Sequence, residues 1–320
     1  MGLLLLLLII KYIEMTKVLV ATEKPFAPEA VSQIKEIVEN AGFEFALLEK
    51  YESNEELLKA VADATAMIIR SDKATKEVLD AAKELKIIVR AGAGYDNIDL
   101  EAATTNQVVA MNTPGQNSNA VAELALGMMV FQARSQFNGK AGTELKGKTL
   151  GIHAYGNVGR YVAAIAKGFG MTVMAFDPFV DKANIEADGV KALDSVEDLY
   201  ASCQYISLHI PANDKTKKSI NFDLLNTMPA GATLVNTARK EVIDEEGLLK
   251  LMDERKDFTY LSDIAPDCKS DFEANYDGRF FFTPKKMGAQ TSEANINAGV
   301  AAANQIVDFI NNGNITFKVN

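Results

Sequence analysis

Two adjacent lysines, Lys285 and Lys286, stand between a proline and a glycine in the segment TPKKMGAQTSEAN, residues 283–295. An ammonium group in a site of low polarity can exchange a proton with a substrate hydroxyl or carbonyl group. Most such pairs are solvated surface, and the chain is acidic, with a formal net charge of −10. The elements that position the pair must show whether it is a solvated surface pair or a proton-transfer site.

A second candidate site is the turn Ala154-Tyr155-Gly156-Asn157-Val158-Gly159, which lies between an apolar run and an amphipathic stretch. Gly156 would let the backbone approach a pyrophosphate, and Gly159 would let a helix pack closely on a strand. The helix start would offer free N–H groups to phosphate. The dinucleotide fingerprint is imperfect because Ala154 replaces its first glycine, and such glycines also occur for packing alone.

The next apolar run, TVMAFD, ends in Asp177, 18 residues after Gly159. A carboxylate at this position can accept hydrogen bonds from ribose hydroxyls and would repel a 2′-phosphate. The alternative is a turn residue before Pro178. Strand, turn, helix, strand and acid follow in order, which favours NAD over NADP.

The two histidines are poor candidates for acid–base chemistry. His153 has apolar neighbours, which is typical of a satisfied core residue. His209 ends a later strand, just before Pro211, where it would line a cofactor cleft.

Composition excludes several classes of function. With 320 residues, 48% hydrophobic and 24% charged, the chain predicts about two ordinary globular domains. A pI near 4.9 argues against nucleic acid as a partner. Cys203 and Cys268 lie far apart and give no disulfide framework or metal spacing, which fits a reducing, cytoplasmic location and no metal.

The first 14 residues begin with MGLLLLLLII, which is too short to span a bilayer and lacks the features of a signal peptide. We interpret residues 1–14 as an extension before a natural start at Met15. A membrane anchor is the alternative, and we expect no membrane association.

From Lys17 onward, short apolar runs alternate with amphipathic stretches, which predicts parallel sheets covered on both faces. The expected strands are 17–21, 43–48, 66–70, 86–90, 148–153, 172–177, 205–211, 232–239 and 258–265, and a closing helix follows residue 291. A turn at Pro114-Gly115 separates two series. The fold class predicted is α/β, with two doubly wound parallel-sheet domains.

Five longer motifs give the chain a resemblance to a known family. They are RAGAGYDNID (90–99), NTPGQNSNAVAELALGMM (112–129), LKGKTLGIHAYGNVGR (145–160), LHIPANDKTKKSI (208–220) and TLVNTARKEVIDEEGL (233–248). In this order they resemble the D-isomer-specific 2-hydroxyacid dehydrogenases, from Lys17 to the C-terminus. The resemblance implies a Rossmann NAD-binding domain, 113–289, inserted into a flavodoxin-like substrate-binding domain, 15–112 and 290–320. It also implies a homodimer built by the helix after Pro114.

The resemblance also implies roles for individual residues. Arg239 would grip the substrate carboxylate and polarise the 2-oxo group, and Asp263 would hold the nicotinamide carboxamide. The backbone N–H groups of Gly92 and Ala93 would bind the substrate carboxylate, and the cations Arg70 and Lys73 would bind a substrate phosphate. The cofactor contacts expected are Tyr155, Gly156, Asn157, Val158, Gly159, Asp177, His209, Ile210, Pro211, Thr237, Ala238, Asp263, Gly288 and Ala289.

The sequence departs from the family at the proton-transfer group. The family's histidine in T-P-H-x-G-A falls on Lys285 when counted from Pro284, and on Lys286 when counted back from Gly288. The second register is preferred because GAQTSEA starts the closing helix. The glutamate that partners this histidine falls on Cys268, with Asp267 one residue earlier as the nearest carboxylate.

A lysine can do this work if its pKa falls from the usual value of about 10.4. Burial and a nearby positive charge, from Arg239 or oxidised nicotinamide, would lower that pKa, and a partner glutamate would raise it. The loss of the glutamate is therefore consistent with a lysine, and the chain resembles a subgroup of the family with lysine at this position.

The function implied is NAD-dependent oxidation of D-3-phosphoglycerate to 3-phosphohydroxypyruvate, which opens serine biosynthesis. One alternative is a glyoxylate or hydroxypyruvate reductase; another is a non-catalytic NAD-sensing protein resembling the C-terminal-binding corepressors. Some relatives carry a C-terminal serine-sensing module, which is not expected in a chain that ends at Asn320.

Overall fold

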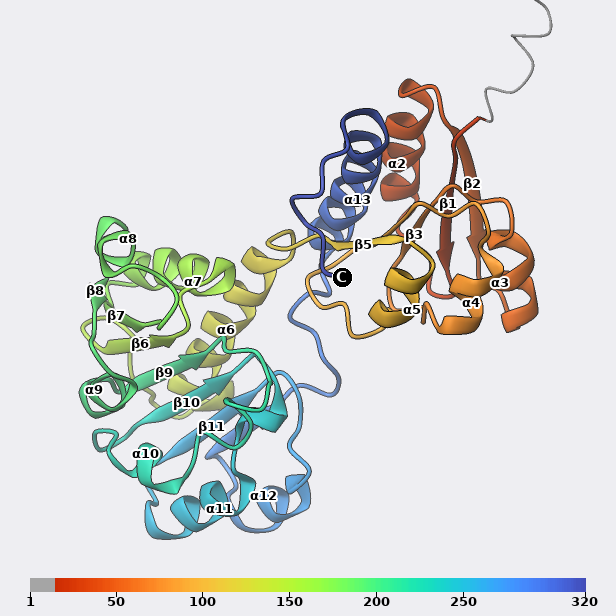
Figure 1. Cartoon of the computed structure of the whole chain (residues 1–320). Coiled ribbons are helices and arrows are strands. Elements are labelled where there is room, and N and C mark those ends of the chain that lie inside the picture. The colour runs from red at the N-terminus through yellow and green to blue at the C-terminus, as the bar shows by residue number, and fades with distance from the viewer. Residues whose placement is uncertain (1–14) are drawn as a thin grey trace, which may run out of the picture. The chain divides into compact units, whose positions relative to one another are not determined.

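The computed structural model describes residues 15–320 and divides the chain into two compact units, each with its own parallel sheet (Figure 1). One unit comprises the residues up to Asn117 together with Ser292–Asn320, and the other comprises Ser118–Thr291. The predicted extension, residues 1–14, lies outside the described residues.

The first unit is built on five parallel strands in the order β2-β1-β3-β4-β5. The strands are β1 (Lys17–Thr22), β2 (Glu44–Glu49), β3 (Ala66–Ile69), β4 (Ile87–Arg90) and β5 (Val109–Asn112). This is the flavodoxin-like strand order.

Helices cover both faces of this sheet. Alternate strand residues point to opposite faces, so Val18 and Val20 pack under one helix layer while Leu19 and Ala21 pack under the other. The layer over Val18 contains α2 (Pro28–Asn40) and α13 (Ser292–Asn312), which lie side by side although they come from opposite ends of the chain (Figure 1). The other layer contains α3 (Asn54–Val61), α4 (Lys76–Ala81) and α5 (Leu100–Thr105).

The second unit is built on seven parallel strands in the order β12-β11-β10-β9-β6-β7-β8. The strands are β6 (Thr149–His153), β7 (Thr172–Phe176), β8 (Lys191–Ala192), β9 (Tyr205–Leu208), β10 (Thr233–Asn236), β11 (Thr259–Ser262) and β12 (Phe280–Phe282). The chain begins this sheet at β6 and reverses direction between β6 and β9, which is the doubly wound arrangement of a Rossmann fold. The predicted fold class is confirmed.

The helices of this unit again form two layers. One contains α6 (Ser118–Ala133) and α7 (Asn157–Gly168), and the other contains α9 (Val196–Ser202), α10 (Phe222–Asn226), α11 (Glu245–Glu254) and α12 (Lys269–Asn275). Helix α8 (Lys182–Ala187) and two 3-10 turns, η1 (Ser135–Phe137) and η2 (Lys240–Val242), complete the unit.

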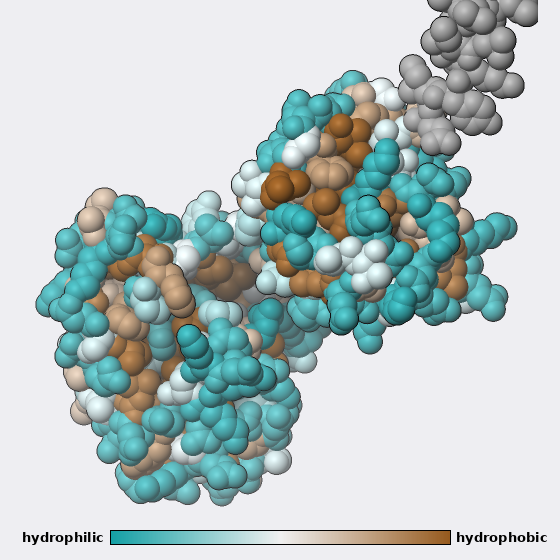
Figure 2. All heavy atoms as spheres, viewed as in Figure 1, coloured by the Kyte–Doolittle hydropathy of each residue, from teal (hydrophilic) through white to brown (hydrophobic). Residues whose placement is uncertain are grey.

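The visible surface is mostly hydrophilic, with apolar residues scattered across it (Figure 2). Phe179 is the most exposed of the large apolar side chains in the described part of the chain, at 93%. Among residues 15–320, no helix is both long and apolar enough to cross a membrane.

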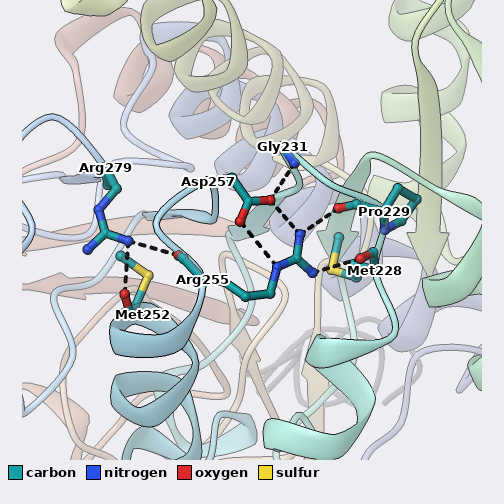
Figure 3. Close-up of polar contacts among 7 residues, drawn as sticks. All are labelled: Met228, Pro229, Gly231, Met252, Arg255, Asp257 and Arg279. Atoms are coloured by element: carbon teal, nitrogen blue, oxygen red, sulfur yellow. Dashed lines mark hydrogen bonds and ion pairs between the residues drawn. The ribbon is translucent and has the colours of Figure 1, made fainter.

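Polar contacts around Arg255 and Asp257, the polar brace, join the loop before β10 to the end of α11 (Figure 3). The Arg255 guanidinium donates to the carbonyls of Met228 and Pro229 at 2.7 and 2.8 Å and forms an ion pair of 2.7 Å with Asp257. The Asp257 carboxylate also accepts the Gly231 N–H at 2.6 Å. The loop before β10 and the end of α11 are thereby fixed to each other.

Removing this brace should weaken folding. Arg255→Leu leaves two carbonyls and a carboxylate without their donor, so we expect the free energy of unfolding to fall by about 2 kcal/mol. Arg255 holds the pKa of Asp257 at about 2, below its ordinary value of 3.8. The stabilisation is therefore complete above about pH 4 and is lost as the pH falls toward 2.

Denaturant unfolding at a series of pH values tests this expectation. The stability difference between wild type and Asp257→Asn should shrink between pH 4 and pH 2. Asp214→Asn, at a fully exposed carboxylate, is the control and should show no such change. A difference for Asp257→Asn that is independent of pH would contradict the brace.

Candidate active site

The glycine-containing turn joins β6 to α7, as predicted. Gly156 is the N-cap residue of α7, and no side chain caps the helix there. A Cβ added to Gly159 would lie 2.5 Å from the Ala154 carbonyl oxygen, whereas one added to Gly156 would meet nothing within 4 Å. Gly159 therefore serves the packing of helix on strand, and Gly156 leaves open backbone at a helix N-terminus that could hold a phosphate.

The Ala154 backbone is strained at the position where the dinucleotide fingerprint has its first glycine. Its φ of 80° lies in the left-handed region, which costs an alanine on the order of 1 kcal/mol and a glycine nothing. The backbone thus adopts the turn that the missing glycine would favour.

Asp177 follows β7 and faces this turn. One of its carboxylate oxygens accepts the Tyr155 N–H at 2.7 Å, and the other accepts the Phe179 N–H at 2.8 Å. Both bonds fix the carboxylate beside Gly156, where it could also accept hydrogen bonds from ribose hydroxyls. The exposed Phe179 ring beside it was not predicted as a site residue.

The two histidines end neighbouring strands and are both held neutral. His153 Nδ1 lies 3.2 Å from the Tyr200 hydroxyl, and His209 Nε2 lies 2.9 Å from the Ser207 hydroxyl. Burial lowers the pKa of His153 to about 4, and burial together with the nearby His153 lowers that of His209 to about 3. His209 also lies 3.5 Å from Thr237, at the point where the strand order reverses.

The other predicted cofactor contacts of the second unit lie at the same ends of strands. Ile210 is buried and Pro211 is exposed just after β9, Thr237 and Ala238 follow β10, and Asn157 and Val158 begin α7. The Tyr155 ring is fully buried, and its hydroxyl donates to Asp188 at 3.1 Å.

Arg239 follows β10 on a loop that a buried side chain organises. Arg239 Nη1 donates to the Ala238 carbonyl at 3.0 Å, and the Arg239 carbonyl accepts the Asn236 side-chain amide at 3.0 Å. Sequence reasoning missed Asn236, although its place before a candidate arginine at the end of a strand was a usable signal.

Asp263 follows β11 and anchors the loop after β12 that carries Lys285 and Lys286, the lysine loop (residues 283–288). The residue is 1% exposed, its carboxylate accepts the N–H groups of Met287 and Gly288 at 2.7 and 2.8 Å, and the Thr283 hydroxyl oxygen lies 3.1 Å from it. A Cβ on Gly288 would lie 2.9 Å from this carboxylate, so the loop needs glycine there. Asp263 thus fixes the backbone of the lysine loop, and its predicted contact with nicotinamide stays a prediction.

The lysine loop leaves the sheet from β12, next to β11. Lys285 and Lys286 are both exposed, and Ala289 is half-buried. The Lys285 carbonyl accepts the Thr283 hydroxyl at 2.8 Å. The backbone between the proline and the glycine is therefore bound from both sides, by Thr283 and by Asp263.

The segment in which the family's glutamate is missing holds a different carboxylate. Glu245, at the start of α11, accepts the N–H groups of Asp267 and Cys268, both at 2.9 Å. Burial and Glu245 raise the pKa of the Cys268 thiol to about 12, so this thiol stays protonated. The exposed Asp267 carboxylate pairs with Lys240 at 2.5 Å.

The strand order brings the second unit's candidates into one row. Parallel strands end at the same edge of a sheet. Read across β12, β11, β10, β9, β6 and β7, that edge carries the lysine loop, Asp263, Arg239, His209, the Gly156 turn and Asp177. Within residues 15–320, no group of three or more His, Cys, Asp or Glu side chains could hold a metal ion.

In the first unit, the two cations predicted to bind phosphate have different surroundings. The Arg70 guanidinium donates to the Pro25 carbonyl at 2.8 Å and to the Asn295 side chain at 2.6 Å, and it lies 4.9 Å from the centre of the Phe26 ring. Lys73 is exposed and lines an open cavity of about 760 Å³ with Lys50, Tyr51, Asp72 and other residues at the ends of β1, β2 and β3. Burial lowers the pKa of Arg70.

The predicted carboxylate-binding loop follows β4. The Gly92 N–H donates to the Arg90 carbonyl at 2.9 Å, and Asn112 donates to the Ala93 carbonyl at 2.6 Å. The turn already uses the Gly92 N–H as a donor, and its predicted contact with a substrate carboxylate stays a prediction. Gly92 has a φ of 150°, and a Cβ there would lie 1.8 Å from an Arg90 guanidinium nitrogen.

Comparison with known proteins finds one family. Residues 118–273 match the model of the NAD binding domain of D-isomer specific 2-hydroxyacid dehydrogenases. The chain is 36% identical to a D-3-phosphoglycerate dehydrogenase of Methanocaldococcus jannaschii over 79% of the chain and 51% of that protein. It is also 36% identical to a hydroxypyruvate reductase of Thermotoga maritima over 64% of the chain and 70% of that protein.

A solved structure resembles almost the whole chain. It is the crystal structure of cofactor (NAD+)-bound 3-phosphoglycerate dehydrogenase from Entamoeba histolytica, with 50% identity and a TM-score of 0.84 over 96% of this chain and 99% of that one. The chain spans about half the length of the curated phosphoglycerate dehydrogenases that it matches.

The two glycines of the turn should respond differently to alanine. Gly159→Ala should lower the free energy of unfolding by about 2 kcal/mol, because its Cβ would overlap the Ala154 carbonyl. Gly156→Ala should leave stability within about 0.5 kcal/mol and still weaken NADH binding, because its Cβ would fill open space beside the helix N-terminus.

Urea unfolding and NADH fluorescence titration measure the two effects. Gly168→Ala, at the other end of α7 and also in open space, is the control and should change neither quantity appreciably. A Gly159→Ala variant as stable as wild type would show that the turn is not packed as described.

Proposed function

Because the chain belongs to the D-isomer-specific 2-hydroxyacid dehydrogenase family, we propose that it oxidises D-3-phosphoglycerate to 3-phosphohydroxypyruvate with NAD, at the entry to serine biosynthesis. The observation that carries the proposed reaction is the row of lysine loop, Asp263 and Arg239 on three adjacent strands, β12, β11 and β10. The names of the phosphoglycerate dehydrogenase relatives support the choice of substrate.

The residues of the β6–α7 turn suit a bound dinucleotide. The uncapped first turn of α7 and the open backbone at Gly156 would receive the pyrophosphate, and Asp177 would accept the ribose hydroxyls and select NAD. Tyr155, Asn157, Val158 and Gly159 form the rest of this turn, and His209, Ile210, Pro211, Thr237, Ala238, Asp263, Gly288 and Ala289 lie at neighbouring strand ends. A bound NAD would supply the acceptor for the hydride that leaves C2 of the substrate.

Lys286 is the proposed group that takes the proton of the substrate hydroxyl, and Lys285 is the alternative. Both are exposed in the structure, so the surroundings of low polarity that proton transfer needs would have to come from the exclusion of water by substrate and cofactor. Asp263 would keep the loop in register for this transfer, because it binds the backbone immediately after the lysine pair.

Arg239 is the proposed partner of the substrate carboxylate and of the developing 2-oxo group, through two parallel N–H donors. Lys73 and Arg70 remain the proposed phosphate cations, and Ala93 with Gly92 the proposed loop beside the carboxylate. Arg70 and Gly92 would have to exchange intrachain partners to act. Asp267 remains a proposed acidic group of the site, and its carboxylate forms an ion pair with Lys240.

Substitution of each lysine tests the mechanism. Lys286→Ala should lower kcat for 3-phosphoglycerate oxidation by about 100-fold or more, because general acid–base groups contribute 10²–10⁴-fold. The NADH dissociation constant should change little. Lys285→Ala should have an effect of less than about 5-fold, and Asp267→Asn an intermediate one, measured as initial rates of NADH formation.

The same assay separates the alternatives. 3-Phosphoglycerate, D-glycerate and D-lactate are compared as substrates of the wild type. Preference for D-glycerate would support the hydroxypyruvate reductase function, for which the Thermotoga relative is the specific observation. NADH binding without turnover of any substrate would support a non-catalytic NAD sensor, and full activity of both alanine variants would exclude lysine as the acid–base group.

A cytoplasmic homodimer is part of the proposal.

A further inference from the structure

The loop that carries Arg239 has a single buried amide at its base, Asn236, which is 2% exposed. Its Oδ1 accepts the Ala238 N–H at 2.9 Å, and its Nδ2 donates to the Arg239 carbonyl at 3.0 Å. One backbone partner can only donate and the other can only accept, so the orientation of the amide is fixed. An aspartate of the same shape would supply the acceptor but not the donor.

The same residue ties this loop to the neighbouring strand. Asn236 Nδ2 also lies 3.3 Å from the hydroxyl of Tyr260 on β11, and the Asn236 carbonyl accepts the Asp263 N–H at 2.9 Å. Tyr260 is fully buried, and burial raises its pKa to about 12, so its hydroxyl stays neutral. The Asn236 side chain therefore holds the Arg239 loop, and its backbone carbonyl holds the start of the Asp263 loop.

We propose that Asn236 is a positioning residue, which acts on the reaction only by fixing the backbone from which the Arg239 guanidinium reaches the substrate carboxylate. This inference rests on the proposed function, in which Arg239 binds that carboxylate. The Arg239 backbone is extended, with φ −141° and ψ 144°, and its guanidinium donates to the Ala238 carbonyl within the same loop. Loss of the hydrogen bonds that Asn236 forms would therefore shift the Arg239 backbone and reorient its guanidinium group.

Asn236→Asp is the sharpest probe, since it keeps the acceptor for the Ala238 N–H. It removes the donor and sets an oxygen against the Arg239 carbonyl, which the loop can relieve only by moving. We expect kcat/KM for 3-phosphohydroxypyruvate reduction to fall by about 100-fold, as a displacement near 1 Å can cost that much. The loss should lie largely in KM, and the NADH dissociation constant should stay within about 2-fold.

Two matched controls separate position from stability. Asn221→Asp makes the same change at a helix N-cap whose side chain only accepts a hydrogen bond, from Leu224. Tyr260→Phe removes the second anchor of Asn236, and Tyr276→Phe removes a tyrosine hydroxyl bonded to Asp253 at 3.0 Å instead. Tyr260→Phe should raise KM in the same direction as Asn236→Asp, whereas Tyr276→Phe and Asn221→Asp should leave it unchanged at equal temperature.

A double-mutant cycle with Arg239→Lys gives the decision. If Asn236 acts through Arg239, Asn236→Asp should add less than about 3-fold in the Arg239→Lys background; independent effects would multiply. Multiplied effects in an active enzyme would overturn the inference alone. A wild type that reduces no 2-oxo acid would overturn the proposed function with it. Should Asn236→Asp fail to fold, the cycle between Tyr260→Phe and Arg239→Lys decides by the same criterion.

Discussion

The structure depends on one constraint: in each sheet every strand runs in the same direction, so all carboxyl ends meet at one edge. At that edge the backbone leaves the ladder, and its N–H and C=O groups need new partners. The candidate chemistry of the second unit lies along this edge. The groups come from distant parts of the sequence, and strand order alone makes them neighbours.

Short polar side chains supply the missing partners at several of these ends. Asp177 receives two backbone N–H groups after β7, Asn236 receives one and donates one after β10, and Asp263 receives two beyond β11. Asp72 does the same after β3 for the Glu23 N–H, at 2.7 Å. Each of these side chains fixes a loop with hydrogen bonds at the point where a rigid element stops. Such loops can then present arginine, lysine or open backbone in a defined direction.

Much of this arrangement could be predicted from the sequence. Apolar runs and helical periodicity predicted nine strands and the fold class, because buried parallel strands have a distinct pattern. The strands β5, β8 and β12 were missed. They lie at or next to the sheet ends, and β8 and β12 are only two and three residues long, too short for a periodic signal.

The positions of the candidate residues at strand ends were predictable from the sequence, whereas their hydrogen bonds were less so and their roles stay predictions. The motif placed Gly156 and Gly159 correctly, since their spacing follows from the geometry of the turn. The bond from the Gly92 N–H to Arg90, the contacts of Arg70 with Pro25 and Asn295, and the pairing of Asp267 with Lys240 arise from tertiary contacts. No local pattern encodes them. Glu245 was missed for the same reason, because its partners become visible only when the loops are folded, whereas Asn236 had a signal in its place before Arg239.

The hydrogen bond from the Tyr155 N–H to Asp177 has a consequence for engineering cofactor preference. Because a carboxylate at this position disfavours a 2′-phosphate, a change of preference toward NADP would begin with replacement of this acidic residue. In this protein the same carboxylate also tethers the strained Ala154 turn to β7. An exchange at Asp177 would therefore loosen the turn before α7 along with the proposed ribose contact. A glycine at position 154, which relaxes the turn by itself, is the natural companion substitution.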